Sequence, residues 1–255
     1  MPTREVEALV LRHYPLSEGD RIVVLMTKEH GTLRAVAQGA CKPRSRLGGC
    51  LEPMTHVCVQ LYAREGSELA RIWQCEIVRS YLGRNPTLDR VFGYSYMGEL
   101  SQELAQENNP NALLFRLLLA VLDAGEQIGL NQALLRYFEL WALRLNGWLP
   151  DYDSCPACGK CVKDQGFYAW LEAGQGRCRA CADHRGIRVG PEAACQLQEI
   201  LQLSPARFAS GAHSAAALRD LERLAQSLIE WHLEKRLKSY GTLKEVLGVG
   251  GRPEP

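Results

Sequence analysis

The strongest constraint in this sequence is a set of four cysteines arranged as two closely spaced pairs. The pairs are Cys155-x2-Cys158 and Cys178-x2-Cys181, and nineteen residues separate them. Two residues between cysteines allow a tight turn to bring both sulfurs to one side, and two such turns supply the four thiolates of a tetrahedral zinc site. Because four thiolates complete the coordination of zinc, the spacing predicts one structural Zn²⁺ with no open position for catalysis.

Other kinds of cysteine site fit this arrangement less well. An iron–sulfur run of the ferredoxin type would need a further cysteine followed by proline, and the sequence from Val162 onward offers none nearby. A thioredoxin-like redox pair would lie between a strand and a helix, a setting that this loop lacks. A zinc deaminase needs an H-x-E motif before its cysteine pair, but the HLE motif at His232 follows both pairs. We therefore expect a structural metal.

Two further residues complicate the choice of metal ligands. Cys161 and His184 each lie three residues beyond a cysteine pair. Either residue can replace a cysteine in a zinc site, but the symmetric set of four cysteines needs neither. The prediction is therefore that the four paired cysteines bind the metal and that Cys161 and His184 do not.

The composition is that of an ordinary soluble globular protein. The chain has 255 residues, of which 46% are hydrophobic and 23% are charged, so it can bury a core and form one large or two to three small domains. The start, MPTREVEALV, has no basic region followed by a long apolar run, which argues against an export signal. The most continuous apolar stretch, ALLFRLLLAVL, contains Arg116 and is too short to cross a membrane. We expect a cytoplasmic protein, in whose reducing environment clustered cysteines more often bind metal than form disulfides.

The most pronounced charge bias lies in the first third of the chain. The formal net charge is only +1, but the first 84 residues carry twelve basic and nine acidic residues, and no acidic residue occurs between Glu29 and Glu52. This window contains four basic residues: Arg34, Lys42, Arg44 and Arg46. Lysine and arginine on a loop can contact phosphates without reading base sequence, and the alternative is that they simply face solvent. The window is therefore a candidate DNA-binding segment.

The first part of the chain has the pattern of β-strands. Five strand-like runs occur in VEALVLRHY, RIVVLMTKEHGTLRAVAQG, HVCVQLY and LARIWQCEIV, with a turn at His30-Gly31 in the second segment. The segment CKPRSRLGGCLEP predicts a long loop between the third and fourth strands. Five short strands indicate a small barrel, for which the OB fold is the common nucleic-acid-binding solution. Tyr62 and Trp73 fall on the last two strands, where they either stack on bases or pack in the core.

After Asn85-Pro86 the apolar period becomes that of α-helices. The first helix is expected to bury one stripe of side chains: Leu88, Val91, Phe92, Leu100 and Leu104. Asn109-Pro110 predicts the start of a second helix, with a capping residue and a proline at the first helical position. A third helix is expected between Asn131, which caps its start, and Gly147, which ends it.

A later helix, roughly from Ser214 to Lys238, is expected to complete the bundle across the cysteine insert. Its apolar residues recur at helical spacing: Leu218, Leu221, Leu224, Leu228 and Trp231. Five apolar residues of the earlier helices are expected to form core, with a groove for a partner's peptide as the alternative: Leu117, Leu118, Val121, Leu140 and Trp141. Four scattered cysteines are expected to be small core residues: Cys50, Cys58, Cys75 and Cys195.

These patterns predict an α+β multidomain protein, with an OB-fold β-barrel followed by an α-helical domain that carries a four-cysteine zinc-finger insert. The expected divisions are a barrel over 1–81, a first helical part over 82–150, the insert over 151–189, a second helical part over 190–240 and a tail over 241–255. Between Cys155 and Arg188 the insert holds three acidic residues and six basic ones. The basic residues are Lys160, Lys163, Arg177, Arg179, Arg185 and Arg188. These bases either contact phosphates or merely offset the charge of about −2 on a zinc with four thiolates.

The order of these segments resembles that of the RecO family of bacterial recombination mediators. The resemblance covers essentially the whole chain, and its most specific parts are the S-E-G-D turn, the strand G-T-L-R-A-V-A-Q-G-A and the loop K-P-R-S-R. One departure is Cys41, where a further basic residue is expected before Lys42. This departure slightly reduces the charge of the loop.

The resemblance implies a protein that binds single- and double-stranded DNA, anneals complementary strands and catalyses no reaction. It also implies partnership with RecR, contact with the C-terminal tail of single-stranded DNA-binding protein, and through these an indirect role in loading RecA. The expected DNA-binding residues are those of the basic window and the two aromatic strand residues: Arg34, Lys42, Arg44, Arg46, Tyr62 and Trp73. A protein with this role would work in the cytoplasm, associated with the nucleoid.

Two other classes of function stay open on sequence alone. One is a zinc-ribbon adaptor or transcription-associated protein that acts mainly through protein contacts. The other is an enzyme acting on nucleic acid, although the sequence contains no phosphate-binding loop, no G-x-S-x-G and no H-E-x-x-H motif. An adaptor would show little affinity for oligonucleotides, and an enzyme would show turnover that depends on metal or nucleotide.

Overall fold

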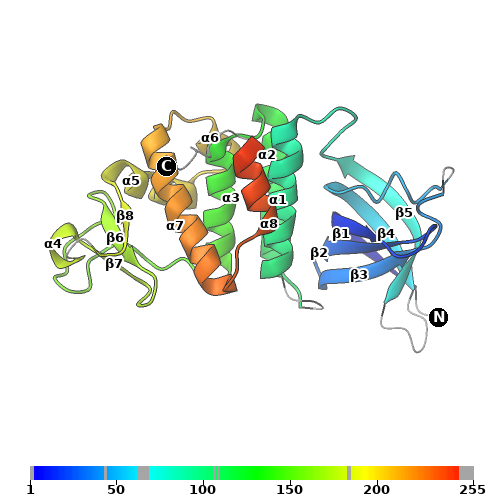
Figure 1. The fold of residues 1–255 in the computed structure, drawn as a ribbon, viewed down its shortest axis with the longest axis horizontal. Coiled ribbons are helices and arrows are strands. Elements are labelled where there is room, and N and C mark those ends of the chain that lie inside the picture. Colours follow the sequence, from blue (N-terminus) through cyan, green and yellow to red (C-terminus); the bar gives the residue numbers. More distant parts are fainter. Residues whose placement is uncertain are drawn as a thin grey trace, which may run out of the picture. The chain divides into compact units, whose positions relative to one another are not determined.

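The computed structural model describes residues 3–42, 45–62, 69–105, 107, 109–182 and 185–246. The chain forms two compact units, and Figure 1 labels their helices and strands. Unit 1 contains Met1–Leu119 together with Leu237–Pro255, and unit 2 contains Ala120–Arg236. The C-terminal part of the chain therefore belongs to the same unit as the N-terminal strands.

Five strands of unit 1 close into a barrel in the order β1-β2-β3-β5-β4. Their bounds are β1 (Thr3–Pro15), β2 (Arg21–Thr27), β3 (Gly31–Ala37), β4 (Thr55–Tyr62) and β5 (Ala70–Ser80). Neighbouring strands are antiparallel except β3 and β5, which run parallel where Ala35 lies opposite Ala70. The five predicted strands are confirmed, and so is the turn at Gly31, whose φ of 63° suits glycine.

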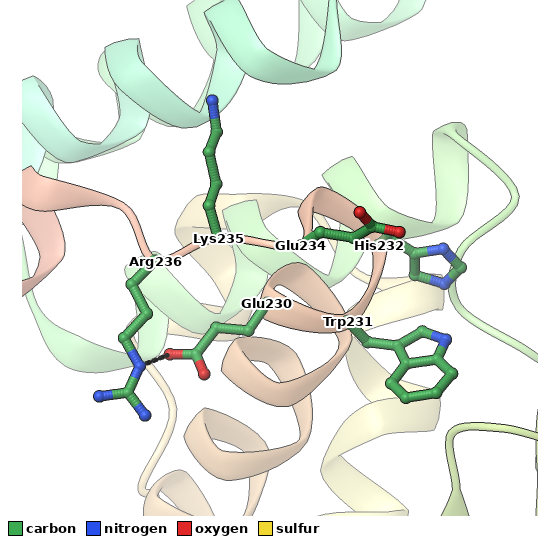
Figure 2. A pocket seen from close by; sticks show the side chains of 6 residues that line it. All are labelled: Glu230, Trp231, His232, Glu234, Lys235 and Arg236. Atoms are coloured by element: carbon green, nitrogen blue, oxygen red, sulfur yellow. Dashed lines mark ion pairs between the residues drawn. The ribbon is translucent and has the colours of Figure 1, made fainter.

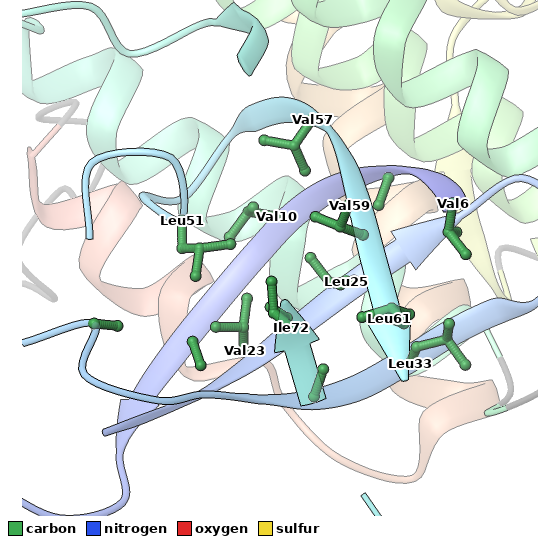
Figure 3. Close-up of a cluster of buried hydrophobic side chains, with 14 residues drawn as sticks. Val6, Val10, Val23, Leu25, Leu33, Leu51, Val57, Val59, Leu61 and Ile72 are labelled. Atoms are coloured by element: carbon green, nitrogen blue, oxygen red, sulfur yellow. The ribbon is translucent and has the colours of Figure 1, made fainter. Parts of the chain in front are cut away.

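Apolar side chains from all five strands fill the barrel (Figure 3). β-branched and leucine residues point inward because successive strand residues face opposite sides. The labelled members of this core are Val6, Val10, Val23, Leu25, Leu33, Leu51, Val57, Val59, Leu61 and Ile72. One of them, Leu51, comes from the segment between β3 and β4, so that segment is anchored in the barrel core.

Two helices of unit 1 pack against each other, α1 (Leu88–Leu104) and α8 (Lys238–Val246), and α1 also packs against β1 of the barrel. At Gly98 of α1 a Cβ atom would lie 2.7 Å from Cε of Met54, so a larger residue here would displace the end of the Met54 side chain. Ser239 of α8 donates its backbone N–H to Glu99 Oε2 at 2.9 Å. The ring centroids of Tyr96 and Tyr240 are 5.2 Å apart. These contacts dock the C-terminal helix on α1.

The predicted apolar stripe of α1 is wrong at its first member, and Val91 and Phe92 are half-buried. Leu100 and Leu104 are buried, but Leu88 is 66% exposed. The buried face instead contains Tyr94, Tyr96, Met97 and Gly98. Because α1 packs against both β1 and α8, its buried surface is wider than the single stripe that an apolar period indicates.

The predicted start of the second helix is also wrong. Helix α2 (Ala112–Ile128) is capped by Asn111, whose Oδ1 accepts a hydrogen bond from the Leu114 N–H at 3.1 Å. The Asn109-Pro110 pair precedes this cap. An asparagine two residues after the expected one therefore accepts a hydrogen bond from an otherwise unpaired backbone N–H of the first helical turn.

Unit 2 is built around helix α3 (Gln132–Leu145), which contacts three other helices. These are α5 (Pro191–Gln202), α6 (Pro205–Ala209) and α7 (Ala215–Leu233). The predicted bounds of α3 are confirmed, because Asn131 Oδ1 accepts from the Leu134 N–H at 2.9 Å and Gly147 follows the helix with a φ of 71°. Trp141 of α3 also donates a hydrogen bond from Nε1 to the Ile200 carbonyl of α5 at 2.8 Å.

Helix α7 is shorter than predicted. Ser214 caps its start as expected, accepting from the Ala217 N–H at 3.1 Å. The helix ends at Leu233, because Glu234 takes the left-handed conformation with φ 54°. The chain then begins α8 at Lys238, so residues that the sequence suggested as the end of one helix and a tail form a separate helix.

Several expected core residues lie partly or fully in solvent. Cys195 is exposed, and Cys50, Cys58 and Cys75 are half-buried. Trp231 is 48% exposed, whereas Leu221, Leu224 and Leu228 of the same helix are buried as predicted. Of the other predicted core residues, Leu118, Val121 and Leu140 are buried, and Leu117 and Trp141 are half-buried. Among the residues described, no helix has the length and apolar character needed to span a membrane.

Candidate metal centre and nucleic-acid interface

The first cysteine pair lies on a tight turn, and the backbone of Cys155 takes part in its three hydrogen bonds. The N–H groups of Cys158 and Gly159 donate to the Cys155 carbonyl at 3.3 and 2.8 Å, and Cys155 N–H donates to the Lys160 carbonyl at 2.8 Å. Gly159 has a φ of 71°, a conformation that glycine adopts without strain. The sequence C-P-A-C-G therefore folds locally into a turn that presents both sulfurs on one side.

The second cysteine pair begins the short helix α4 (Arg179–Ala182). The N–H groups of Cys181 and Ala182 both donate to the Cys178 carbonyl at 3.0 Å. A three-stranded antiparallel sheet supports this turn, in the order β7-β6-β8. Its strands are β6 (Phe167–Trp170), β7 (Gln175–Arg177) and β8 (Ile187–Val189). We refer to residues 155–189, with the two turns and this sheet, as the metal module.

The four sulfur atoms lie close enough together to bind one metal ion. All four are within 4.8 Å of one another, and Cys158 Sγ is 3.7 Å from Cys178 Sγ. A zinc ion with Zn–S bonds of about 2.3 Å places tetrahedrally arranged sulfurs about 3.8 Å apart. The residues present therefore fit a four-thiolate metal site.

Of the two further candidate ligands, the structure describes Cys161 but not His184. Cys161 is exposed, its Sγ contacts Asp164 Oδ1 at 3.7 Å, and it is not a member of the four-cysteine cluster. His184 lies outside the described residues. Among the described residues the cluster consists of the four cysteines that the spacing predicts.

Backbone amides favour the thiolate form at two of these cysteines. Burial raises the pKa of Cys155, but hydrogen bonds from the N–H groups of Cys178, Ala157 and Cys158 outweigh it and lower the pKa to about 6. A hydrogen bond from the backbone of Cys181 lowers the pKa of Cys178. The side chain of Cys178, by contrast, raises the pKa of Cys181 to about 12. Metal ligation requires thiolates, so the turns are arranged to supply part of this charge before a cation binds.

The inner face of the metal module is packed against a buried tyrosine. The rings of Tyr152 and Phe167 are stacked, with centroids 4.4 Å apart. A Cβ atom at Gly176 would lie 2.7 Å from Cδ1 of Tyr152, so β7 needs glycine where it crosses this ring. Burial raises the pKa of the Tyr152 hydroxyl. This aromatic pair fixes the sheet that holds the second cysteine turn.

The basic residues after β3 lie on an anchored segment of the barrel. Cys41 N–H donates to the Gly19 carbonyl at 3.0 Å, and Lys42 N–H donates to the Gly39 carbonyl at 3.1 Å. Lys42 and Arg46 are both exposed. The backbone is therefore fixed near both positions while the two cationic side chains reach solvent.

The other two members of the basic window differ from these. Arg34 lies on β3 and forms an ion pair with Glu107, with 2.7 Å between Nε and Oε1. Its charge is thus compensated in the structure, although both side chains are about half exposed. Arg44 lies outside the described residues.

Trp73 is directed into solvent by an irregularity in β5. In the β4–β5 ladder Gln60 lies opposite Gln74 and Leu61 lies opposite Ile72, so Trp73 is an extra residue, a β-bulge. Bulges redirect side chains and are common near binding sites. Trp73 is 71% exposed, which excludes the core alternative for this residue. Tyr62 is half-buried at the end of β4, opposite Arg71.

The structure brings the basic segment close to this tryptophan strand. The Cys50 thiol lies 3.3 Å from the Arg46 carbonyl and 3.6 Å from the Cys75 carbonyl. Cys75 is two residues from Trp73 on β5. Exposed cations and an exposed aromatic ring therefore lie on neighbouring parts of the same barrel. The sequence did not indicate Ile77 and Val78, which are 50% and 58% exposed on the same strand.

A separate pocket lies at the C-terminal end of α7 (Figure 2). It is lined by Glu230, Trp231, His232, Glu234, Lys235 and Arg236. Arg236 Nε and Glu230 Oε1 form an ion pair at 3.2 Å, and the His232 ring stacks on Trp148 with centroids 4.6 Å apart. Burial lowers the pKa of His232, and a hydrogen bond that the imidazole donates to the backbone of Trp148 opposes this shift. Charged side chains of both signs line this pocket.

The fold and site define a class of protein: a small barrel with exposed cations and a helical unit with a four-cysteine metal module. Two family descriptions match the chain, Recombination protein O N terminal over residues 1–81 and Recombination protein O C terminal over residues 85–241. The chain belongs to the Recombination protein O (RecO) family.

Curated relatives support this assignment along nearly the whole chain. A DNA repair protein RecO of Koribacter versatilis is 35% identical over 248 residues, which cover 95% of this chain and 99% of the relative. One of Anaeromyxobacter dehalogenans is 34% identical, with coverage of 96% and 98%. One of Geobacter metallireducens is 32% identical, with coverage of 96% and 99%. The resemblance predicted from the S-E-G-D turn and the K-P-R-S-R loop is confirmed.

Proposed function

We propose that this protein is a non-catalytic recombination mediator that binds single- and double-stranded DNA and anneals complementary strands in DNA repair. The observation that carries the proposal is that the Cys50 thiol contacts both the basic segment, at the Arg46 carbonyl, and β5, at the Cys75 carbonyl. This contact places Arg46 beside the strand that presents Trp73. Relatives named DNA repair protein RecO support the same biological setting.

We also propose that the barrel is an OB fold. A five-stranded closed barrel with the order β1-β2-β3-β5-β4 and a parallel contact between β3 and β5 supports this assignment. OB folds bind nucleic acid with a charged groove and aromatic side chains on the strands. The proposed DNA-binding surface thus consists of the segment between β3 and β4 together with the outer side of β5.

Binding on this surface combines two kinds of contact. Lys42, Arg44 and Arg46 neutralise backbone phosphates, which releases counterions and makes affinity depend on salt. Trp73 offers the face of its ring to a base, and such stacking tolerates any sequence. Tyr62 is a second stacking candidate, and Arg34 can reach a phosphate once its ion pair with Glu107 opens. A surface of this kind holds single strands without sequence preference, as annealing requires.

Replacing Lys42, Arg44 and Arg46 with alanine is expected to reduce the slope of log affinity against log salt by about 2, since each phosphate contact contributes roughly 0.7 on a single strand. The loss should be similar for all sequences, because contacts to the backbone carry no base information. Fluorescence anisotropy with a labelled oligonucleotide at several salt concentrations measures the slope. An unchanged slope in the folded triple variant would place the phosphates elsewhere.

Two matched variants sharpen this experiment. Trp73→Ala should weaken binding without changing the salt slope, because stacking releases no counterion. A triple variant of Arg207, Arg219 and Lys238 to alanine removes the same charge from exposed positions outside the proposed surface. It should retain the slope of the unmodified protein. A strand-annealing assay with two complementary oligonucleotides then tests the activity itself.

We propose RecR and the C-terminal tail of single-stranded DNA-binding protein as protein partners, and through them an indirect role in loading RecA. This proposal rests on family membership. A peptide of that tail is acidic and apolar, so calorimetric titration should detect binding that weakens as salt rises. A titration with no heat, together with no competition by the peptide for the full-length partner, would contradict it. This binding would occur at the nucleoid, in the cytoplasm.

The metal is proposed to be one Zn²⁺ held by Cys155, Cys158, Cys178 and Cys181. Four thiolates fill the coordination of zinc, so the ion would stabilise the module and take no part in a reaction. Elemental analysis should find about one zinc per chain. If oligonucleotide binding is absent while partner proteins bind, the alternative of a zinc-ribbon adaptor is favoured instead.

A further inference from the structure

The sheet of the metal module carries aromatic and basic side chains side by side on one face. Tyr168 of β6 lies opposite Arg177 of β7 and also opposite Arg188 of β8. Residues directly opposite in an antiparallel sheet project to the same side. These three residues therefore form a row across the sheet, with the tyrosine between the two arginines. Trp170, two residues along β6, projects to the same face.

The burial pattern identifies this face as the outer one. Phe167, Ala169, Gly176 and Val189 alternate with the row and are buried, so they form the inner face. On the other face Tyr168, Trp170 and Arg177 are half-buried and Arg188 is exposed. The aromatic and basic side chains of this outer sheet face therefore reach solvent.

Arg177 is held in place over an aromatic ring. Its Cζ atom lies 3.7 Å from the centre of the Trp170 ring, a close cation–π contact. The ring is supported at its edge by Gly186, where a Cβ atom would lie 2.9 Å from Trp170 Cδ1. Because the guanidinium is already oriented, binding an anion would cost little side-chain entropy. The Arg177 guanidinium is thus preorganised for binding a ligand.

Neither arginine of the row is compensated by an acid within the described part of the chain. Arg177 Nε is buried and lacks a hydrogen-bond partner there. No carboxylate among the described residues lies in ion-pair distance of Arg177 or Arg188, in contrast to Arg136, Arg144 and Arg223 of the same unit. Burying part of a guanidinium without an acceptor is unfavourable, so this arrangement favours an anionic ligand.

We propose that the outer sheet face of the metal module is a second contact surface for single-stranded DNA. Arg177 and Arg188 each bind one backbone phosphate, and a base between these phosphates stacks on Tyr168 or on the Arg177–Trp170 pair. Single-stranded DNA fits because only unpaired bases expose the faces that aromatic rings and guanidinium planes bind. The proposal rests on the DNA-binding function proposed above and adds a site where the sequence alone indicated only an excess of basic residues.

The first test removes the charge of the row. Arg177→Ala/Arg188→Ala should reduce the slope of log affinity against log salt for single-stranded DNA by about 1.4, from roughly 0.7 per phosphate. Arg207→Ala/Arg219→Ala removes two exposed arginines from the same unit and should leave the slope unchanged. Metal content and melting temperature show that both variants keep the fold. An unchanged slope in the folded Arg177/Arg188 variant would overturn the proposal.

The second test reads the stacking directly. An oligonucleotide that carries 5-iodouracil should crosslink under ultraviolet light to the peptide that contains Tyr168 and Trp170, as mapped by mass spectrometry. Arg177→Lys/Arg188→Lys keeps the charge but not the guanidinium plane, so it should keep the salt slope and bind more weakly. Absence of this crosslink, with crosslinks at the barrel present, would overturn the proposal. Equal competition by duplex DNA for the crosslinked site would overturn the single-strand assignment.

The same measurements separate this proposal from the proposed function. If the unmodified protein binds no single-stranded DNA, the proposed function itself fails. If the variant of Lys42, Arg44 and Arg46 loses slope and the Arg177/Arg188 variant does not, the DNA-binding function stands and only the second surface is wrong. If both variants lose slope and the combined variant loses the sum of the two, independent phosphate contacts on the two surfaces support the proposal.

Discussion

Replacing Cys178 with serine is expected to unfold the metal module while the barrel stays folded. The module spans residues 155–189, fewer than the roughly 40 residues below which a domain usually needs a metal or disulfides to fold. The binding free energy of a structural zinc, about 10–16 kcal/mol in small peptides, is at the same time folding free energy. Loss of one ligand should therefore remove most of the order in the module.

Three measurements check this expectation. Elemental analysis should show zinc falling from about one per chain to a small fraction. Limited proteolysis should cut between residues 155 and 189, and the melting temperature and solubility should fall. DNA affinity should keep the contribution of the barrel segment and lose only the part of the salt slope that the Arg177/Arg188 variant loses. A Cys178→Ser variant of unchanged stability that loses all DNA binding would reverse the assignment of a structural metal.

The matched control is Cys161→Ser. Cys161 lies in the same module but is exposed and contacts Asp164, outside the four-sulfur cluster. This variant should keep its zinc, its resistance to protease and its melting temperature. If it loses zinc to the same extent as Cys178→Ser, the metal takes a different set of ligands from the one that the spacing predicts.

The cysteine cluster could be predicted from sequence because its geometry is mostly local. A spacing of two residues defines each turn, Gly159 completes the first one, and only the meeting of the two turns depends on the fold. The strands of the barrel could be predicted for a similar reason, since their apolar residues alternate over short runs. The family resemblance then covered the order of the segments, which no single motif gives.

Features that depend on register or on distant partners could not be predicted. The exposure of Trp73 depends on a bulge in β5, and a strand pattern alone cannot place an extra residue. The ion pair of Arg34 joins β3 to Glu107, more than 70 residues away in the chain. The row of Arg177, Tyr168 and Arg188 exists only because three short strands pair in one register.

Helix ends were also hard to predict from the sequence, although the residues that decide them are close together in the chain. Asn111 caps α2 where Asn109-Pro110 has the better sequence pattern, because both asparagines satisfy the same local rule. Glu234 ends α7 in a left-handed conformation that glycine or asparagine usually adopts, so no residue type marked this point. The separate helix α8 follows from that break and docks on α1 through Glu99.

The second large effect is expected at a buried charge cluster between α3 and α7. Arg136 and Glu139 of α3 have side chains that are 5% and 0% exposed, with 2.8 Å between Arg136 Nε and Glu139 Oε2. Arg136 also donates a hydrogen bond from Nη2 to Glu139 Oε1 at 2.9 Å. From α7, Gln226 donates to Glu139 at 2.7 Å, and Glu222 lies 3.6 Å from Arg136. The cluster therefore joins the two helices at the centre of unit 2.

Arg136→Ala is expected to destabilise unit 2 by about 3–5 kcal/mol, because it removes the paired guanidinium from a fully buried carboxylate. That loss is a large part of the roughly 5–15 kcal/mol by which domains are usually stable. Urea denaturation followed by circular dichroism measures it. Arg144→Ala provides the control, since the ion pair of Arg144 with Asp151 is exposed and contributes at most about 1 kcal/mol.

A second substitution tests the cause of this loss. Adding Glu139→Gln to Arg136→Ala removes the buried carboxylate charge but keeps an amide oxygen that can accept from Gln226. If uncompensated charge causes the destabilisation, the double variant should recover a large part of the stability that Arg136→Ala loses. If lost packing of the arginine side chain causes it, the double variant should be no more stable than the single one. The double-mutant cycle therefore decides whether charge or packing at this cluster holds α3 to α7.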